Sequence, residues 1–384
     1  MRFIHFARNA ARSLTLTALA AAVVAASGGT PALALSARPQ TAPLFNGSVY
    51  AIAYRGTTAY VGGSFTSATS GGRTYARQRL AAFDTRTGAM LAWAPTADRT
   101  VRALAVSGTS IYAGGDFGLI SGLRRDNLAG MDAVTGRLSR FSHTVSGAPY
   151  ALAVGNGRLY AGGSFTAVDG SRRGNLAAFS LSTFALDGGW RPSADDAVHA
   201  VRAYGTKVYI GGSFHKVNGV SGTLRVAALS ATGGAVHRSF LPKAPAQVNG
   251  MAVDGTGVYV ATGGQGGRAI AYSTGGAVRW QRLFDGDATA VARLNGVTYV
   301  GGHFDRACLT LSNGLHGTCS DGSVSRVKLA AVNGTGGLTG WAPQANGVIG
   351  VRALAVDGAR AAIGAGGDFT VVAGQNRKRY ASFS

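Results

Sequence analysis

Any carboxylate chemistry in this chain has to use aspartate, because the 384 residues include 16 acidic side chains and none of them is Glu. Lys and Arg together number 37, which gives a formal net charge of +21. Clustered cations attract polyanions, so the charge favours an acidic polymer as a binding partner. A genome rich in G and C, which encodes much arginine, is an alternative explanation of the same excess.

Two positions recur along the sequence with polar or aromatic residues that vary from copy to copy. The first starts a short Ala-rich hydrophobic segment, and the second directly follows a Gly-Gly pair. If these segments are antiparallel neighbours, both positions lie on one rim, where their side chains line a channel mouth. The candidate ligand-binding residues are Tyr50, Arg102, Tyr150, His199, Asn249 and Arg352 at the first position, and Asp116, His303 and Asp368 at the second. For the second set, hydrogen bonding to turn amides is the alternative.

Charge pairing is predicted at two of these copies. Arg102 and Arg352 stand in the two copies that also carry Asp after the glycines, which predicts ion pairs with Asp116 and Asp368. No catalytic residue is assigned. His199 has no further ligands at metal-binding spacing, and neither a metal ion nor a cofactor is expected.

The loops that follow the Gly-Gly pairs carry many further bases. A solvated basic surface and a ligand patch are both compatible with them. These loop residues are Arg73, Arg77, Arg79, Arg124, Arg125, Arg172, Arg173, Lys216, Arg377, Lys378 and Arg379.

Cys308 and Cys319 are the two cysteines of the chain. In an oxidising environment such a pair most simply forms a structural disulfide that closes one loop. A metal-binding or nucleophilic thiol is the alternative, and His303 and His316 are the histidines nearby in the sequence.

The elements that position all these residues come from an internal repeat. An aromatic-hydrophobic-Gly-Gly element such as Tyr60-Val61-Gly62-Gly63 recurs seven times at intervals of about 50 residues, in two copies with altered glycines. Each copy contains four short segments of strand character, separated by turn glycines, and no helical period follows residue 34. The sequence therefore predicts an all-β fold, a seven-bladed β-propeller of four-stranded antiparallel blades. A solenoid is the structural alternative, but it needs distinctive capping ends.

The ring is predicted to close through the N-terminal segment. The final copy stops at Tyr380-Ala381-Ser382-Phe383, which is its third strand. Residues 36–46 belong to no copy, so we expect them to pair beside residues 379–383 as the missing outer strand. Such pairing would cover an otherwise open sheet edge.

The repeat resembles a known family. The run Val-x-Ala-Leu-Ala-Val, Tyr-x-Gly-Gly-x-Phe, Leu-Ala-Ala-Phe-x-x-x-Thr-Gly and Trp-x-Pro is similar to the delta-60 type propeller repeats of secreted actinobacterial proteins, over residues 49–384. This resemblance implies the propeller fold and implies no activity. The glycine pair is also kelch-like, and residues 82–88 resemble the tryptophan-docking motif of quinoprotein dehydrogenases.

Residues 1–34 have the features of a secretory signal peptide, which leaves residues 35–384 as a single propeller domain. Arg2, Arg8 and Arg12 precede an apolar core over residues 14–26, and a small-x-small cleavage site ends at Ala34. No later segment predicts a transmembrane helix. We therefore expect a secreted, extracellular protein, held to the cell wall by non-covalent contacts or released.

Three function classes are compatible with these features. The first is a non-catalytic binding or scaffold module for an acidic cell-envelope or extracellular polymer. The second is a polysaccharide hydrolase or lyase with an Asp/His/Tyr site at the channel mouth, such as Asp116 with His199 and Tyr150; the missing Glu weakens a two-carboxylate glycosidase. The third is a quinone- or copper-dependent oxidoreductase. The sequence contains no catalytic constellation and no nucleic-acid motif, which favours the first class, in a monomer without a specific nucleic-acid partner.

Overall fold

The fold is built from antiparallel sheets that repeat one strand order. The computed structural model describes Met1 and residues 35–384, so the predicted signal peptide lies outside the described residues apart from Met1. In each repeated sheet the first strand pairs with the second, and the second pairs with the third. The element Leu315–Gly317 is a 3₁₀ helix, and the other elements of the described residues are strands.

The bounds of the strands follow the repeat. The first strands are β2 (Val49–Arg55), β7 (Val101–Ser107), β13 (Val145–Gly155), β17 (Val198–Tyr204), β20 (Val248–Asp254), β24 (Ala288–Leu294) and β29 (Val351–Asp357). The second strands are β3 (Thr58–Gly63), β8 (Ser110–Gly115), β14 (Arg158–Val168), β18 (Lys207–Gly212), β21 (Gly257–Thr262), β25 (Val297–Gly302) and β30 (Ala362–Gly367). The third strands are β6 (Leu80–Asp84), β11 (Leu128–Asp132), β16 (Leu176–Ser180), β19 (Val226–Ser230), β22 (Arg268–Tyr272), β28 (Leu329–Val332) and β33 (Tyr380–Phe383).

The fourth segment of each copy is shorter than expected. It forms a strand in two sheets, as β12 (Leu138–Ser142) and β23 (Val278–Leu283). In four others it is reduced to one bridge, such as Phe83 with Met90 or Phe179 with Leu186. Short hairpin strands occupy the loops: β1 (Leu44–Phe45), β4 (Ser67–Ser70), β5 (Arg73–Ala76), β9 (Leu119–Ile120), β10 (Leu123–Arg124), β15 (Ser171–Arg172), β26 (Arg306–Cys308), β27 (Ser323–Ser325), β31 (Val371–Val372) and β32 (Gln375–Asn376).

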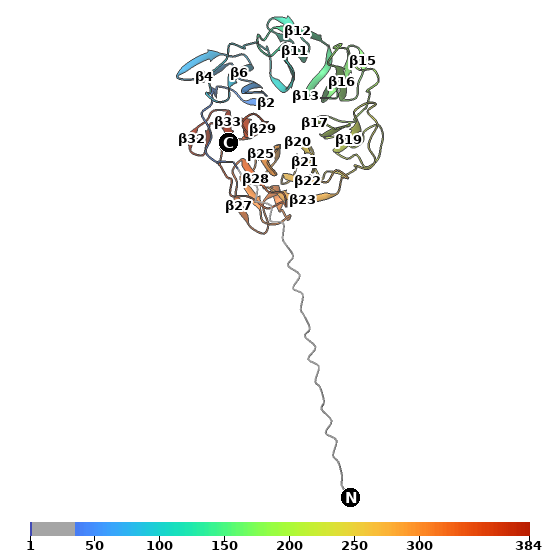
Figure 1. The fold of residues 1–384 in the computed structure, drawn as a ribbon, viewed down its shortest axis with the longest axis vertical. Helices are drawn as coiled ribbons and strands as arrows, with labels where there is room; N and C mark the ends of the chain where they lie inside the picture. Colours follow the sequence, from blue (N-terminus) through green and yellow to red (C-terminus); the bar gives the residue numbers. More distant parts are fainter. Residues whose placement is uncertain (2–34) are drawn as a thin grey trace. The chain divides into compact units, whose positions relative to one another are not determined.

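The first strands contact one another in sequence order. Each of β2, β7, β13, β17, β20 and β24 contacts the next first strand, and β29 contacts β2. In Figure 1 the labels β2, β13, β17, β20 and β29 lie toward the middle of this part of the chain, with β4, β12, β15, β19 and β32 farther out. The side chains at the beginnings of the first strands are thereby brought close to each other.

The Gly-Gly pair is required by the spacing between sheets. A Cβ atom on Gly62 would lie 2.6 Å from Cγ1 of Val101 in the next sheet, closer than real Cβ contacts allow. A Cβ atom on Gly63 would collide with the Ser48 carbonyl oxygen. The pair therefore lets adjacent sheets and the entry loop approach the second strand.

Aromatic side chains fill the outer spaces between sheets. Trp93 is 2% exposed, and its ring packs edge-on against Tyr60 with 5.1 Å between the centroids. The indole N–H of Trp93 donates to the carbonyl oxygen of Asp132 in the next sheet at 2.9 Å. Trp190 with Tyr160 and Trp341 with Tyr299 repeat this packing. Burying these large rings contributes strongly to the cohesion between sheets.

The N-terminal segment lies against the last sheet. Ser36 N donates to the Ser384 carbonyl at 3.3 Å, and Gln40 N donates to the Ser382 carbonyl at 2.8 Å. Phe45 is 1% exposed and packs with Phe65 and Phe83. Residues 36–40 therefore lie beside β33, but they do not form the predicted outer strand, since the strand of this segment, β1, pairs with β4 of the first copy.

Candidate ligand-binding site

A cavity of about 610 Å³ opens where the first strands converge, and we call it the mouth cavity. Its polar and aromatic lining residues are Tyr50, Arg102, Tyr150, His199, Arg202, Asn249, Asp287, Thr289 and Arg352. The structure thus brings the six predicted entry residues of the first set, together with Thr289, to one place. A volume of this size is typical of small-ligand sites.

A β-bulge positions each entry side chain. In β2, Val49 pairs with Gly63 and Ala51 pairs with Gly62, so Tyr50 is the extra residue of a bulge. The same shift occurs in every first strand, and the extra residues are Tyr50, Arg102, Tyr150, His199, Asn249, Thr289 and Arg352. We call these the bulge residues. A bulge redirects a side chain out of the regular alternation, and here it directs one residue per sheet into the mouth cavity.

Cationic and aromatic bulge residues contact each other along one side of the mouth cavity. The guanidinium carbon of Arg352 lies 5.0 Å from the Tyr50 ring centroid, and that of Arg102 lies 5.8 Å from the Tyr150 centroid. Tyr150 in turn stacks on His199, with centroids 5.5 Å apart and planes 5° from parallel. Tyr50 therefore has one protein partner at its ring, and Tyr150 has two, Arg102 and His199.

The predicted Arg102–Asp116 ion pair is present. Arg102 Nε donates to Asp116 Oδ1 at 2.7 Å, and this hydrogen bond raises the pKa of the Arg102 guanidinium. The side chains are 40% and 31% exposed. At such exposure the pair contributes about 0.2–1 kcal/mol to folding. Asp116 thus orients Arg102 at the mouth and is not itself among the lining residues.

The prediction that Arg352 pairs with Asp368 is wrong. Asp368 accepts hydrogen bonds from the backbone N–H groups of Gly350 at 2.6 Å and Ile349 at 3.2 Å. Asp368 is therefore occupied by turn amides, which was the alternative for this position. Arg352 lies over Tyr50 instead, and its buried Nε has no hydrogen-bond partner in the described residues.

A chain of hydrogen bonds fixes the orientation of His199. Asn249 Nδ2 donates to the Ala288 carbonyl at 3.0 Å, and Gln247 Nε2 donates to Asn249 Oδ1 at 2.8 Å. Ser213 Oγ donates to Gln247 Oε1 at 2.8 Å, so it can only accept from His199 Nε2, 3.2 Å away. His199 therefore carries a proton on Nε2. Burial lowers the pKa of His199 and favours the neutral ring.

The remaining candidate of the second set, His303, is exposed and is not among the residues that line the cavity. Its carbonyl accepts a hydrogen bond from Lys328 Nζ at 3.0 Å. The hydrolase hypothesis grouped Asp116 with His199 and Tyr150. In the structure Asp116 bonds Arg102, while His199 bonds Ser213, so the carboxylate and the imidazole have separate hydrogen-bond partners.

Sequence reasoning missed two charged lining residues, Arg202 and Asp287. Arg202 stands three residues after the bulge position, within a strand that otherwise reads as hydrophobic core. Asp287 directly precedes β24. A comparison of the copies position by position would have singled out Arg202.

Five loop arginines are structural: four of the loop bases named above, contrary to both interpretations of them, and Arg326; Arg173 is buried and the others are half-buried. Each donates Nη1 to the carbonyl of the preceding residue and Nη2 to a carbonyl of the segment that passes it. The second acceptors are Leu91 for Arg77, Ser139 for Arg125, Asp187 for Arg173, Thr339 for Arg326 and Pro39 for Arg377. Burial lowers the pKa of Arg77, Arg326 and Arg377.

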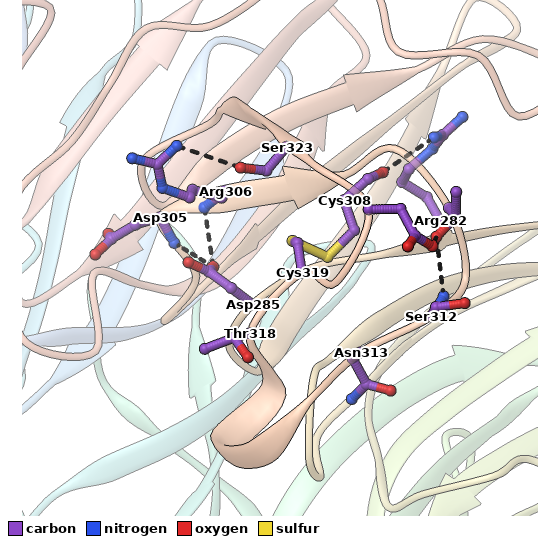
Figure 2. Close-up of a disulfide and its surroundings, with 12 residues drawn as sticks. Arg282, Asp285, Asp305, Arg306, Cys308, Ser312, Asn313, Thr318, Cys319 and Ser323 are labelled. Atoms are coloured by element: carbon purple, nitrogen blue, oxygen red, sulfur yellow. Dashed lines mark hydrogen bonds between the residues drawn. A yellow bond between two sulfur atoms is a disulfide. The ribbon is translucent and has the colours of Figure 1, made fainter.

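The predicted disulfide between Cys308 and Cys319 is present and ties a peripheral insertion to its own first strand, β26. Figure 2 shows the Cys308 carbonyl beside Arg282, whose Nη1 donates to it at 3.4 Å. Asp285 accepts from the backbone N–H of Arg306 at 2.9 Å. The cysteines are therefore structural.

Two further properties concern the described part of the chain. Within it, no group of three or more His, Cys or Asp side chains is arranged to hold a metal ion. Residues 35–384 also contain no helix of the length and apolarity needed to cross a membrane.

Comparison with known proteins identifies the architecture. No family model and no curated sequence matches the chain. The crystal structure of the WD40 β-propeller domain of Doa1 superposes with a TM-score of 0.58, covering 90% of this chain and 96% of that domain at 10% sequence identity. The chain is a β-propeller. The computationally designed Ika8 protein is also similar, with a TM-score of 0.48 and 13% identity over 88% of this chain and 98% of that one. The mouth cavity accordingly lies where the inner strands of the propeller converge.

Proposed function

We propose that this propeller is a secreted, non-catalytic module that binds an acidic polymer of the cell envelope or extracellular space at the mouth cavity. One observation carries the proposal: three of the lining residues are arginines and one is an aspartate. Arg102 is held by Asp116, which leaves Arg352 and Arg202 without an ion-pair partner among residues 35–384. An anionic group is the ligand that such a cavity accommodates best.

We further propose that the propeller has seven blades and that the N-terminal segment closes the ring. The backbone bonds from Ser36 and Gln40 to the end of the chain support closure. Arg377 adds a second argument. Its Nη2 donates to Pro39 at 3.5 Å, whereas the equivalent Arg77 and Arg326 donate to carbonyls of their own fourth segment. Residues near Pro39 thus take the place of the missing fourth segment.

The proposals that the protein is exported and that its partner is an envelope polymer rest on the sequence. Resemblance to delta-60 repeats and the signal-like residues 1–34 support export, and an envelope polymer is the acidic partner that an exported propeller meets. The natural polymer need not be known to test the proposal. Whether the ligand must be acidic can be tested with model polymers.

Binding to polygalacturonate, polyphosphate and the neutral polymer amylose tests the proposal. We expect the purified chain to bind at least one of the acidic polymers, to bind it less tightly as salt rises, and to leave amylose unbound. Arg352→Gln should weaken this binding several-fold. Arg238→Gln, which removes the same charge from an exposed site, is the matched control. Equal binding of amylose, or equal effects of the two substitutions, would overturn the assignment.

A further inference from the structure

One position in the first strands breaks the repeat. In six copies an alanine pairs across to the second strand at this point: Ala53, Ala105, Ala153, Ala252, Ala292 and Ala355. In β17 the equivalent residue is Arg202, which pairs with Tyr209 just as Ala53 pairs with Tyr60. A composition rich in arginine does not explain why one copy alone has replaced the smallest core side chain with the largest cation.

The guanidinium of Arg202 has little compensation from the protein. Nη1 donates to the carbonyl of Val201 at 2.8 Å, and within residues 35–384 the side chain forms no ion pair and no other hydrogen bond. Burial lowers the pKa of Arg202, with no carboxylate to offset the desolvation. Arg202 is half-buried at the cavity wall, and a partly desolvated charge without a counter-charge lowers the stability of the fold. Retaining such a group indicates that its partner comes from outside.

Arg202 lies deeper in the mouth cavity than the bulge residues. It follows Ala200 by two residues, which is roughly 7 Å of strand. At the level of Ala200 the lining side chains are small, with Ala51, Ala103, Ala151, Gly250, Ala290 and Ala353 in the other first strands. The bulge residues and Arg202 line this one cavity, together with the larger side chains of Ile52, Leu104, Leu152, Met251, Val291 and Leu354. A group that enters from the mouth can therefore reach the guanidinium.

We propose that Arg202 forms an oxyanion subsite inside the mouth cavity, which receives the acidic group of a ligand inserted end-on. A polymer lying across the mouth contacts the bulge residues, and a terminal or pendant acidic group reaches down to Arg202. This inference rests on the proposed function and adds the part of the polymer that is recognised. The fork of N–H donors on a guanidinium matches the paired oxygens of a carboxylate or phosphate.

Two lining residues set the limits of this subsite. Arg352 lies at the mouth with its Nε unbonded and adds a second positive charge. Asp287 lines the cavity as well and repels anions from its own part of the wall. Asp287 directly precedes β24, which lies between β20 and β29, so the acidic group is expected to reach Arg202 from the side of β13, away from β24.

The test uses galacturonate, inorganic phosphate and galactose as probes in calorimetry, with the full chain. Galacturonate and galactose differ in the acidic group, and phosphate separates general oxyanion binding from carboxylate binding. Arg202→Ala restores the residue of the other six copies. Arg238→Ala is the charge-matched surface control, and Arg202→Lys keeps the charge without the fork.

We expect wild type and Arg238→Ala to bind galacturonate more tightly than galactose. Arg202→Ala should lower galacturonate affinity about tenfold or more, and Arg202→Lys should recover part of it. Tighter binding of phosphate than of galacturonate would assign a phosphate-bearing polymer to the same subsite. If Arg202→Ala binds galacturonate and phosphate as wild type does, the subsite is wrong while polymer binding stands. If wild type binds no acidic polymer, the proposed function itself fails.

Thermal unfolding gives a second, independent readout. If Arg202 binds ligand and destabilises the ligand-free protein, then its removal should stabilise that protein. Arg202→Ala should therefore have a higher melting temperature than wild type. Galacturonate should raise the melting temperature of wild type and leave that of Arg202→Ala unchanged. A lower melting temperature for Arg202→Ala would mean that Arg202 supports the fold, and would overturn the proposal.

Discussion

At the residue scale, the neutral state of His199 follows from its surroundings. Ser213 holds Nε2 as a donor, and Tyr150 covers one face of the ring. The negative charge of Asp196 partly offsets the burial that lowers the pKa of His199. A proton added to Nδ1 would therefore place a partly desolvated cation against Tyr150.

This arrangement predicts a pH-dependent contribution of His199 to stability. Because its pKa is lower in the folded than in the unfolded state, the contribution is complete above the unfolded value of about 6.5 and is lost as pH falls from there toward the folded pKa. Between pH 7 and pH 5, wild type should lose more unfolding free energy than His199→Gln. Urea unfolding at a series of pH values measures the difference. His215→Gln, at an exposed site, should follow the wild-type curve; parallel curves for wild type and His199→Gln would contradict the assignment.

The sequence predicted which residues line the mouth cavity better than it predicted their contacts. The bulge residues stand out because they vary in an otherwise uniform strand. Their mutual contacts were not predictable, because they depend on side-chain angles between neighbouring sheets. Asp368 illustrates the difficulty. It occupies the same register position as Asp116, because Val351 pairs with Gly367 as Val101 pairs with Gly115. Its carboxylate nevertheless bonds the amides of Gly350 and Ile349 and not Arg352.

At the element scale, the structural loop arginines join the loop of each sheet to its outermost segment. Arg173 is 4% exposed and bonds two backbone carbonyls, at Arg172 and Asp187. Its neighbour Arg172 is exposed. In sequence the two are adjacent and identical, but Arg173 alone stands at a recurring place of the repeat, three residues before the third strand, as Arg77, Arg125, Arg326 and Arg377 do.

This pair provides a prediction with a built-in control. Arg173→Ala should destabilise the fold by about 1–3 kcal/mol, because it removes a buried side chain and the donor to two part-buried carbonyls. Arg172→Ala should change stability by less than about 0.5 kcal/mol. Equilibrium unfolding of both variants measures the difference, and equal effects would show that the carbonyl bonds contribute little.

The strands themselves were predictable for a physical reason. Segments such as Leu80–Asp84 are short hydrophobic runs bounded by turns. The equivalent segments of the other copies have the same character and recur at similar spacing. The fourth segments were overestimated, because an outer segment packs its aromatic residue, for example Trp93, without needing a continuous ladder. Burial of one ring between sheets substitutes there for several backbone hydrogen bonds.

At the scale of the whole molecule, the N-terminal segment joins the two ends of the described fold. Leu35 N donates to the Tyr299 hydroxyl at 3.0 Å, and Trp341 Nε1 donates to the Ser36 carbonyl at 3.2 Å. The segment therefore contacts the last two sheets, while Phe45 packs in the first. Stability that depends on these contacts therefore requires both ends of the described fold.

A chain that begins at Gly47 should be less stable than one that begins at Leu35. Loss of the buried Phe45 alone corresponds to about 3 kcal/mol or more. The exposed edge of β33 should also cause association at high concentration. Thermal unfolding and light scattering measure the two effects. Identical melting temperatures would show that residues 35–46 do not close the ring.

The bulges have a consequence for how such a protein can diversify. An extra residue outside the ladder carries no pairing obligation, so its replacement leaves strand register and sheet spacing unchanged. The chain already contains five residue types at this one position of its repeat: Tyr, Arg, His, Asn and Thr. Randomising the bulge residues together would give a library in which ligand preference varies on a constant scaffold, much as antibody loops vary on a constant framework.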